Sequence, residues 1–456
     1  MSAASLQAGH ALARASLDAC VKCNICETQC PVMAVQPNFA GPKFVGPQAE
    51  RFRQGESVDR TLDYCSSCGS CTLACPQGVK VAELNSQARA VMKAGHMPLR
   101  DRLISQTVLM GKVMSPIAPL ANGALRVKAL RVLIEAFFGV ARDAPMPVAA
   151  GGSFERWFAR RAKRRGGSPP PDADRSRLGP DERPDKPRDG CDAGEVGAAG
   201  EADCIGRLTP NARSRGKIVF FHGCAGNYFE VETSKRAVEV LEHLGYEVLV
   251  PRQGCCGLAR QSNGIFDGAT KNVLELCAAL RSAGADLPIV SASGSCTGML
   301  KHEAHEIMGV DTPELADVSA RVKDVMEFLA DLDAAGELPH KFQPIEATVP
   351  YHAPCQLKSQ GMGLPALDVL ALIPGLKVVE SGRACCGIAG TYGLKKEKRA
   401  IAQAVGAPLF EMFRETGGDL GICDTETCRW QLRQGSGMRV EHPIFLVHQA
   451  LGLGDA

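Results

Sequence analysis

The chain has 456 residues, which is long enough for about three domains. Hydrophobic residues make up 45% of it and charged residues 22%, with a formal net charge of +2. Aromatic residues account for only 5%, and the near-neutral charge creates no general basic field, so a nucleic-acid partner is not expected. Cysteine is the exception to this ordinary composition, because the chain contains 20 of them.

The N-terminal residues 1–13 lack the basic start and apolar core of a secretory signal. Twenty cysteines without export predict a reducing cytoplasm, where thiols bind metals or carry out redox chemistry. No window reaches about 18 uncharged apolar residues, so we expect no membrane-spanning helix. The nearest candidate, residues 113–125, is short and contains Pro116 and Pro119. Any membrane contact should therefore be peripheral or made through a partner.

The N-terminal part carries one cysteine motif twice, with the spacing C-x2-C-x2-C-x3-C-P. This is the spacing of bacterial ferredoxins that hold [4Fe–4S] clusters. In two-cluster ferredoxins the fourth cysteine of each motif ligates the other cluster. We therefore expect one cluster on Cys20, Cys23, Cys26 and Cys75, and a second on Cys65, Cys68, Cys71 and Cys30.

Zinc and disulfides fit this pattern poorly. Zinc sites use separated cysteine pairs rather than four thiols within eleven residues. A disulfide framework needs an oxidising compartment, which nothing in the sequence indicates. Residues 1–98 are thus predicted to form a mostly helical ferredoxin-like domain with two [4Fe–4S] clusters.

Residues 99–165 alternate between apolar and basic stretches and are expected to be helical. Within them, a helix over 124–140 would place Leu125, Leu130, Leu133 and Phe137 near one face, among basic residues. This helix either packs on a neighbouring domain or lies at an interface with anionic lipid or a membrane partner. The basic run that follows Trp157 favours the second interpretation slightly, although such runs are often solvated tails.

Residues 166–215 are rich in Gly, Pro, Asp and Arg and contain little that could fill a core. This composition predicts a disordered linker. Cys191 and Cys204 lie within it, and we expect both to be free thiols, because a flexible segment cannot hold a ligand in fixed geometry.

The remaining residues contain an internal repeat, with a first domain at 216–310, a connector at 311–345 and a second domain at 346–456. Each repeat has a single cysteine, then Cys-Cys-Gly, then another single cysteine, and the copies are offset by 130–132 residues. The cysteines are Cys224, Cys255, Cys256 and Cys296 in the first copy, and Cys355, Cys385, Cys386 and Cys428 in the second. Strand-like and helical runs alternate in both copies, which predicts α/β domains with mainly parallel sheets. The cysteines should then lie at the carboxyl ends of the strands.

Adjacent cysteines followed by glycine can both point into one metal site, whereas a disulfide between them would be strained. Four thiolates per repeat suit an iron–sulfur cluster, so the chain could hold one or two clusters beyond the first pair. Cys277 sits at core-like spacing in a helix and is expected to be a buried apolar residue. His222 and His352 precede the first cysteine of their repeats and could hydrogen-bond a cluster or relay protons. A structural role is the simpler interpretation for both, and for His442.

The repeat resembles the Cys-Cys-Gly domain of heterodisulfide reductases, whose complete pattern ends in C-x2-C. Complete domains of that type can hold a non-cubane iron–sulfur cluster on five cysteines. Here Ser293 and Thr425 stand where the additional cysteine would be, and Cys423 is near but out of step. Two four-cysteine clusters, or one occupied and one vestigial site, both remain open.

The order of motifs also resembles the family of iron–sulfur subunits, designated C, of anaerobic glycerol-3-phosphate dehydrogenases, over nearly the whole chain except 166–215. The stretches that carry this resemblance are Gly41-Pro42-Lys43, Leu109-Met110-Gly111, Phe221-His222-Gly223-Cys224, Cys385-Cys386-Gly387-Ile388-Ala389-Gly390-Thr391-Tyr392-Gly393, Ala407-Pro408-Leu409-Phe410 and Glu441-His442-Pro443. The resemblance implies an electron-transfer subunit, peripheral to the cytoplasmic face of the inner membrane. It would take electrons from a flavin-containing dehydrogenase and pass them to membrane quinone.

Two features of the sequence agree with a conduit that has no catalytic residues of its own. No G-x-G-x-x-G follows a predicted strand, so we expect no flavin in this chain, and no nucleophile–base signature is present. One alternative is a catalytic subunit in which the Cys-Cys-Gly clusters reduce a disulfide. Another is the same conduit serving a different donor, such as a 2-hydroxy-acid oxidase. An iron–sulfur regulator would need a basic recognition helix, which is not apparent.

Overall fold

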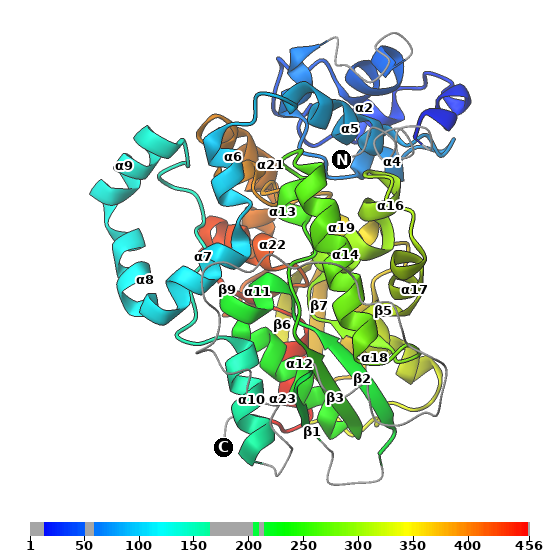
Figure 1. Cartoon of the computed structure of the whole chain (residues 1–456), viewed down its shortest axis with the longest axis vertical. Coiled ribbons are helices and arrows are strands. Elements are labelled where there is room, and N and C mark those ends of the chain that lie inside the picture. The colour runs from blue at the N-terminus through cyan, green and yellow to red at the C-terminus, as the bar shows by residue number, and fades with distance from the viewer. Residues whose placement is uncertain (1–12, 51–58, 165–203, 209–213, 455–456) are drawn as a thin grey trace, which may run out of the picture.

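The computed structural model describes residues 13–50, 59–164, 204–208 and 214–454 (Figure 1). A small helical N-terminal part caps a larger body built from two α/β units, and a helical arm projects from one side of that body. The predicted multidomain architecture, a helical ferredoxin-like domain followed by two repeated α/β Cys-Cys-Gly domains, is confirmed.

The N-terminal part is built from short helical turns that lie between its cysteines. They are η1 (Leu17–Ala19), α2 (Ile25–Thr28), η2 (Phe44–Gln48), η3 (Arg60–Tyr64) and α4 (Ser70–Leu73), followed by the longer α5 (Val81–Lys93). The first ten residues of α5, Val81–Ala90, are all buried, because this helix lies between the cysteine loops and the α/β body. It is the scaffold on which both loops rest.

The arm consists of α6 (Leu99–Ile104), α7 (Thr107–Met114), η4 (Ser115–Ile117), α8 (Ala118–Arg126) and α9 (Lys128–Phe138), and α10 (Phe154–Arg164) follows it. The prediction of one helix over 124–140 is wrong. The helix breaks at Val127, whose extended backbone (φ −73°, ψ 113°) ends α8 and starts α9. At the base of the arm Gly111 packs directly against the Tyr228 ring, so α7 and α11 approach closely.

The first α/β unit contains a five-stranded sheet in the order β1-β3-β2-β4-β5. Four strands are parallel: β2 (Gly216–Phe221), β3 (Tyr246–Pro251), β4 (Ile289–Ser291) and β5 (Val322–Asp324). Its helices are α11 (Gly223–Tyr228), α12 (Val231–His243), α13 (Leu258–Gln261), α14 (Phe266–Ser282), α15 (Gly294–Gly298), η5 (Met299–Glu303), α16 (Ala304–Glu306), α17 (Pro313–Arg321) and α18 (Val325–Ala334). Residues 311–345, expected as a connector, thus supply α17, β5 and α18, and β5 extends this sheet.

The strand β1 (Cys204–Leu208) is a correction to the predicted linker. It pairs antiparallel with β3, because the edge of that strand offers backbone groups that a passing segment can satisfy. Cys204 therefore lies in a strand rather than in a disordered segment. Cys191 lies outside the described residues.

The second unit repeats the arrangement with four parallel strands in the order β7-β6-β8-β9. The strands are β6 (Ala347–His352), β7 (Leu376–Glu380), β8 (Leu420–Cys423) and β9 (Arg439–Glu441). The helices are α19 (Cys355–Lys358), α20 (Pro365–Leu370), η6 (Tyr392–Leu394), α21 (Lys396–Thr416), α22 (Glu426–Ser436) and α23 (Ile444–Ala450).

One hydrophobic core joins the two units. Phe220 and Val250 of the first sheet belong to the same buried cluster as Tyr351 and Ile422 of the second. An ion pair also joins them: Arg429 on α22 is 1% exposed, and its Nη2 lies 3.2 Å from Oε2 of Glu230 in the first unit. A buried charge of this kind requires its partner, so the pair fixes how the units face each other.

Candidate iron–sulfur centres

The first N-terminal loop gathers Cys20, Cys23, Cys26 and Cys75 around one small cavity. Lys22 and Asn24 have left-handed backbone (φ 61° and 68°), which curls the loop so that its thiols face inward. Burial is the main reason why the pKa of Cys26 is raised. Bound iron would reverse this preference, since a metal ion deprotonates the thiols that coordinate it.

The second loop gathers Cys30, Cys65, Cys68 and Cys71 around another small cavity. Its left-handed residues are Ser67 and Gly69, 45 positions after those of the first loop, so the two loops share one conformation. Burial raises the pKa of Cys30 to about 12.

Backbone N–H groups also point at the sulfurs of these loops, as they would at thiolates. Ser67 N donates to Cys65 Sγ at 3.4 Å, and Val79 N donates to Cys75 Sγ at 3.4 Å. The eight cysteines therefore lie in the crossed groups expected from the motif. The donors and loop shape suit iron–sulfur clusters, although the ligand assignment itself stays a prediction.

In the first α/β unit the four repeat cysteines follow three strands: Cys224 lies in α11 after β2, Cys255 and Cys256 lie in the loop after β3, and Cys296 lies in α15 after β4. The sulfurs of Cys224 and Cys255 are 3.7 Å apart, and those of Cys256 and Cys296 are 3.4 Å apart. Gly257 has φ +86°, and a Cβ there would lie 2.9 Å from the carbonyl oxygen of Ala269. Only glycine fits this turn, which leaves its N–H free to donate to Cys255 Sγ at 3.4 Å.

The second unit repeats this geometry. The sulfurs of Cys386 and Cys428 are 3.1 Å apart, and Gly387 (φ +87°) donates its N–H to Cys385 Sγ at 3.3 Å. A hydrogen bond with Cys355 is the first reason why the pKa of Cys385 is raised. All four thiols of this copy are therefore close together, as in the first copy.

Two residues that were not assigned as ligands in the sequence analysis lie beside the cysteines of the second repeat. Cys423, at the end of β8, is fully buried; its thiol donates to the carbonyl of Thr425 at 3.9 Å, and its proximity is one reason why the pKa of Cys428 is raised, after that of Cys386. A ring nitrogen of His352 and the sulfurs of Cys386 and Cys428 all lie within 4.8 Å of one another. The second unit thus offers a fifth thiol and an imidazole, and the position of His352 three residues before Cys355 was the only sequence signal.

His222 and His442, the other two histidines considered in the sequence analysis, have hydrogen-bond partners other than cysteines. His222 Nδ1–H donates to the carbonyl of Gly223 at 2.7 Å, and its Nε2 lies 3.4 Å from Oε1 of Glu155. His442 Nδ1 accepts a hydrogen bond from the N–H of Ile444 at 3.1 Å. Cys277 is buried within the core of the first unit, where it packs as an apolar residue.

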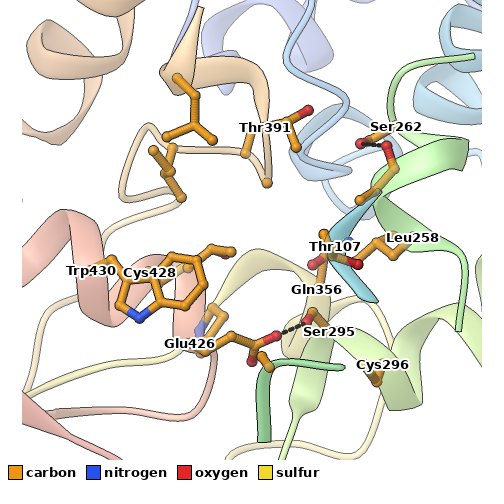
Figure 2. A pocket seen from close by; sticks show the side chains of 18 of the residues that line it. Thr107, Leu258, Ser262, Ser295, Cys296, Gln356, Thr391, Glu426, Cys428 and Trp430 are labelled. Carbon is orange, nitrogen blue, oxygen red and sulfur yellow. Dashed lines mark hydrogen bonds between the residues drawn. The ribbon is translucent and has the colours of Figure 1, made fainter. Parts of the chain in front are cut away.

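All eight repeat cysteines line one shared cavity between the units, of about 160 Å³, and Cys68 of the N-terminal part lines it as well. Figure 2 shows Cys296 and Cys428 on separate sides of this cavity, with Trp430 beside Cys428 and Glu426 between the two sides. A hydrogen bond with Cys385 lowers the pKa of Cys68 to about 6. The second N-terminal loop therefore contacts the second repeat group directly, across a long separation in sequence.

The residue that replaces the missing cysteine in the first copy has a different role. Ser293 donates its hydroxyl to Glu426 Oε2 at 3.1 Å, and Ser295 donates to Oε1 at 3.3 Å. These bonds join the first unit to α22 of the second. Burial raises the pKa of Glu426, so a carboxyl that can exchange protons lies beside the cysteines.

These features define an iron–sulfur protein with a dicluster domain and two cysteine-rich domains. A family model described as a 4Fe-4S dicluster domain matches residues 16–79, and one described as a cysteine-rich domain matches 218–301 and 349–433. The chain is 34% identical, over 96% of its length and 99% of the relative, to the subunit designated C of anaerobic glycerol-3-phosphate dehydrogenase from Escherichia coli strain K12. It belongs to the family of this dehydrogenase subunit.

More distant relatives share the same parts. The chain is 26% identical to the subunit designated B of fumarate reductase (CoM/CoB) from Methanothermobacter marburgensis, over 91% of the chain and 68% of the relative. It is 29% identical to the subunit designated D of dihydromethanophenazine:CoB–CoM heterodisulfide reductase from Methanosarcina barkeri, over 56% of the chain and 64% of the relative. Among the helices that the structure describes, none combines the length and apolarity needed to cross a bilayer.

Proposed function

We propose that the chain is the electron-transfer subunit of a membrane-associated dehydrogenase complex that oxidises glycerol 3-phosphate. The observation that carries this proposal is the contact between Cys68 and Cys385, which joins the N-terminal cysteine loops to the cavity between the repeats. A single connected series of cysteine sites suits a conduit better than independent structural sites would. Membership of the glycerol-3-phosphate dehydrogenase subunit family supports the choice of donor.

Two [4Fe–4S] clusters would be held by Cys20, Cys23, Cys26 and Cys75, and by Cys65, Cys68, Cys71 and Cys30. The repeat groups would hold up to two further clusters, with Cys423 available as a fifth thiol in the second unit. When bound, such clusters accept and donate single electrons. The chain buries most of the repeat cysteines, leaves Cys23 of the first loop exposed, and presents N–H groups to several of the sulfurs.

In this proposal the flavin belongs to the dehydrogenase partner, and the electrons pass to quinone in the membrane. The arm supports a peripheral position, because large apolar side chains on it are exposed, among them Leu120 (75%) and Phe137 (79%). A protein surface in water rarely exposes a continuous apolar patch without a partner or membrane to cover it.

The test is anaerobic purification of the tagged chain with its partner from its own cells, followed by addition of glycerol 3-phosphate. We expect cluster signals to appear in the EPR spectrum, and quinone-analogue reduction to depend on them. Cys23→Ser should remove one signal and stop quinone reduction, while the partner still reduces an artificial flavin acceptor. Cys191→Ser is the matched control, because Cys191 belongs to none of the ligand sets that the sequence predicts.

Other outcomes would redirect the proposal. Reduction by a different donor, such as a 2-hydroxy acid, would support the electron-transfer role but contradict glycerol 3-phosphate as the substrate. Disulfide reduction by this chain without a flavoprotein would favour a catalytic role for the cavity, as the heterodisulfide reductase relatives suggest. A carefully reconstituted preparation without EPR signals would contradict the proposed electron-transfer function.

A further inference from the structure

A groove separates the arm from the second α/β unit. It has a volume of about 800 Å³, and its lining is half apolar, with Leu125, Val132, Met146, Val148 and Trp430 among the apolar side chains. Five cations also line it: Arg126, Lys128, Arg131, Arg142 and Arg433. We name it the arm groove. Its size falls within the usual range of about 300–1,000 Å³ for small-molecule sites. Its lining residues come from the second half of α8, the first half of α9, the segment 142–148 and α22.

The buried guanidinium of Arg131 lines this groove, and one of its nitrogens makes no hydrogen bond to the described residues. Arg131 is 7% exposed, and three of its hydrogen bonds fix the turn after α9: Nε to the carbonyl of Arg142, and Nη2 to those of Ala141 and Ala144. Its Nη1 has no hydrogen-bond partner among the described residues. A buried donor without an acceptor is costly, so the site suits a ligand that brings an acceptor oxygen.

The groove also reaches the cysteine cavity. Met146, Pro147 and Trp430 line both spaces. Trp430 stands two residues after Cys428 on α22, and its Nε1–H donates to Glu230 Oε1 at 2.6 Å, which holds the ring in place. A flat ring in the groove would therefore lie one aromatic side chain away from the cysteines.

We propose that the arm groove binds the ring of a quinone, which accepts electrons from this chain there. This inference rests on the proposed function and names the residues of its acceptor site. A quinone has the apolar ring that the groove can hold and a carbonyl oxygen that can accept from Arg131. The bound quinone gains two electrons, which derive from the donor dehydrogenase, and two protons from water, and leaves as the quinol.

The position of the groove explains how such a ligand would enter. Exposed apolar residues on α8 and α9 would contact the bilayer. The arm groove, which lies between these helices and α22, would open toward the bilayer. A quinone with a long apolar tail could then pass sideways from the membrane without crossing water.

The test uses the complete complex and a photoreactive azido-quinone with a short tail. We expect label on peptides that contain residues 122–148 or α22. Val132→Trp would fill the groove, because Val132 lines it and is 42% exposed. It should lower labelling and raise the KM for quinone about tenfold or more, which corresponds to 1.4 kcal/mol. Ala136→Trp is the matched control, since Ala136 is exposed on the same helix and does not line the groove.

Failure of this inference is distinguishable from failure of the proposed function. If quinone is reduced and labelled normally in Val132→Trp and in Val148→Trp, the acceptor site lies elsewhere and the inference is wrong. If the wild-type complex neither binds nor reduces quinone, the proposed function fails with it. Loss of labelling on addition of quinone-free anionic lipid vesicles would identify the groove as a lipid site and overturn the inference. If Val132→Trp does not fold, Val148→Trp tests the same groove from its other wall.

Discussion

At the scale of single residues, the two repeats share a cysteine arrangement but differ in what surrounds it. Cys423 of the second unit corresponds by the repeat offset to Ser291 of the first. Cys423 contacts Cys428, whereas the Ser291 hydroxyl is buried without a hydrogen-bond partner among the described residues. The two sites therefore differ in the number of thiols they offer, which would give clusters bound there different electronic properties.

Replacing Cys423 by serine should alter the second repeat site alone. We expect Cys423→Ser to lower the iron content or to shift one EPR signal of the anaerobically purified protein, because a soft thiolate is exchanged for a weak oxygen donor. Cys277→Ser is the control: this buried cysteine lies in the core, so the change should lower thermal stability without altering iron. If the iron content and the EPR spectra of Cys423→Ser match those of the wild type, the Cys423 thiol has only a packing role.

At the scale of elements, the arm combines apolar faces with basic residues. Leu109, Val113, Ile117, Leu120, Leu133 and Phe137 are all more than a third exposed. Arg126 and Lys128 flank the break at Val127, where the chain turns between α8 and α9. Such helices bind membrane surfaces by burying their apolar face while basic side chains attract anionic headgroups.

The double variant Leu120→Glu/Phe137→Glu should lose binding to vesicles of anionic lipid. Both side chains are largely exposed, so the midpoint of thermal unfolding should stay close to wild type, as surface changes usually alter stability by about 0.5 kcal/mol or less. Cosedimentation with vesicles measures the effect. Leu274→Glu, at an exposed position on α14, is the matched control and should sediment normally. Equal sedimentation of all three proteins would rule out the arm as the membrane contact.

At the scale of the whole molecule, one buried carboxylate ties three parts of the chain together. Asp101 on α6 is fully buried, and its Oδ2 lies 3.0 Å from Lys93 of α5 and 2.8 Å from Lys395 of the second unit. Burial by itself would raise the pKa of Asp101, but Lys395 and Lys93 outweigh it and hold the pKa below its ordinary value. The contact keeps the N-terminal loops seated on the α/β body.

This ion cluster should make the assembly sensitive to acid. Because the pKa of Asp101 is lower in the folded state, its stabilisation is complete above its unfolded pKa of about 3.9 and is lost as the pH falls below it. Asp101→Asn should reduce the free energy of unfolding by about 3–5 kcal/mol at neutral pH, since buried lysines are left without their carboxylate. The difference from wild type should shrink below about pH 4. Chemical unfolding across this range measures it, and a difference independent of pH would exclude the electrostatic explanation.

Much of the fold follows from local pattern. The crossed cysteine groups, the two parallel α/β units and the family of the chain are all encoded in spacings of a few residues, because a loop that wraps a metal site or a turn after a strand needs particular residues at particular steps. Gly257 and Gly387 illustrate this, since each left-handed turn behind a cysteine pair admits only glycine.

Other features depend on residues that meet only when the chain is packed. The strand β1 forms because the edge of β3 is available for pairing. The sequence of Cys204–Leu208 does not by itself predict this pairing. The hydrogen bond from Ser293 to Glu426 joins residues that are 133 positions apart in the sequence.

Spacing along the backbone is enough to predict the cysteine groups and the family of the chain. The neighbourhood of Cys68 and Cys385, the cavity shared by both repeats and the reach of the arm groove to that cavity could be found only in the folded molecule. These distances are set by side-chain packing between the units and the N-terminal part, together with the Glu230–Arg429 and Asp101–Lys395 ion pairs, and no local sequence pattern encodes such packing.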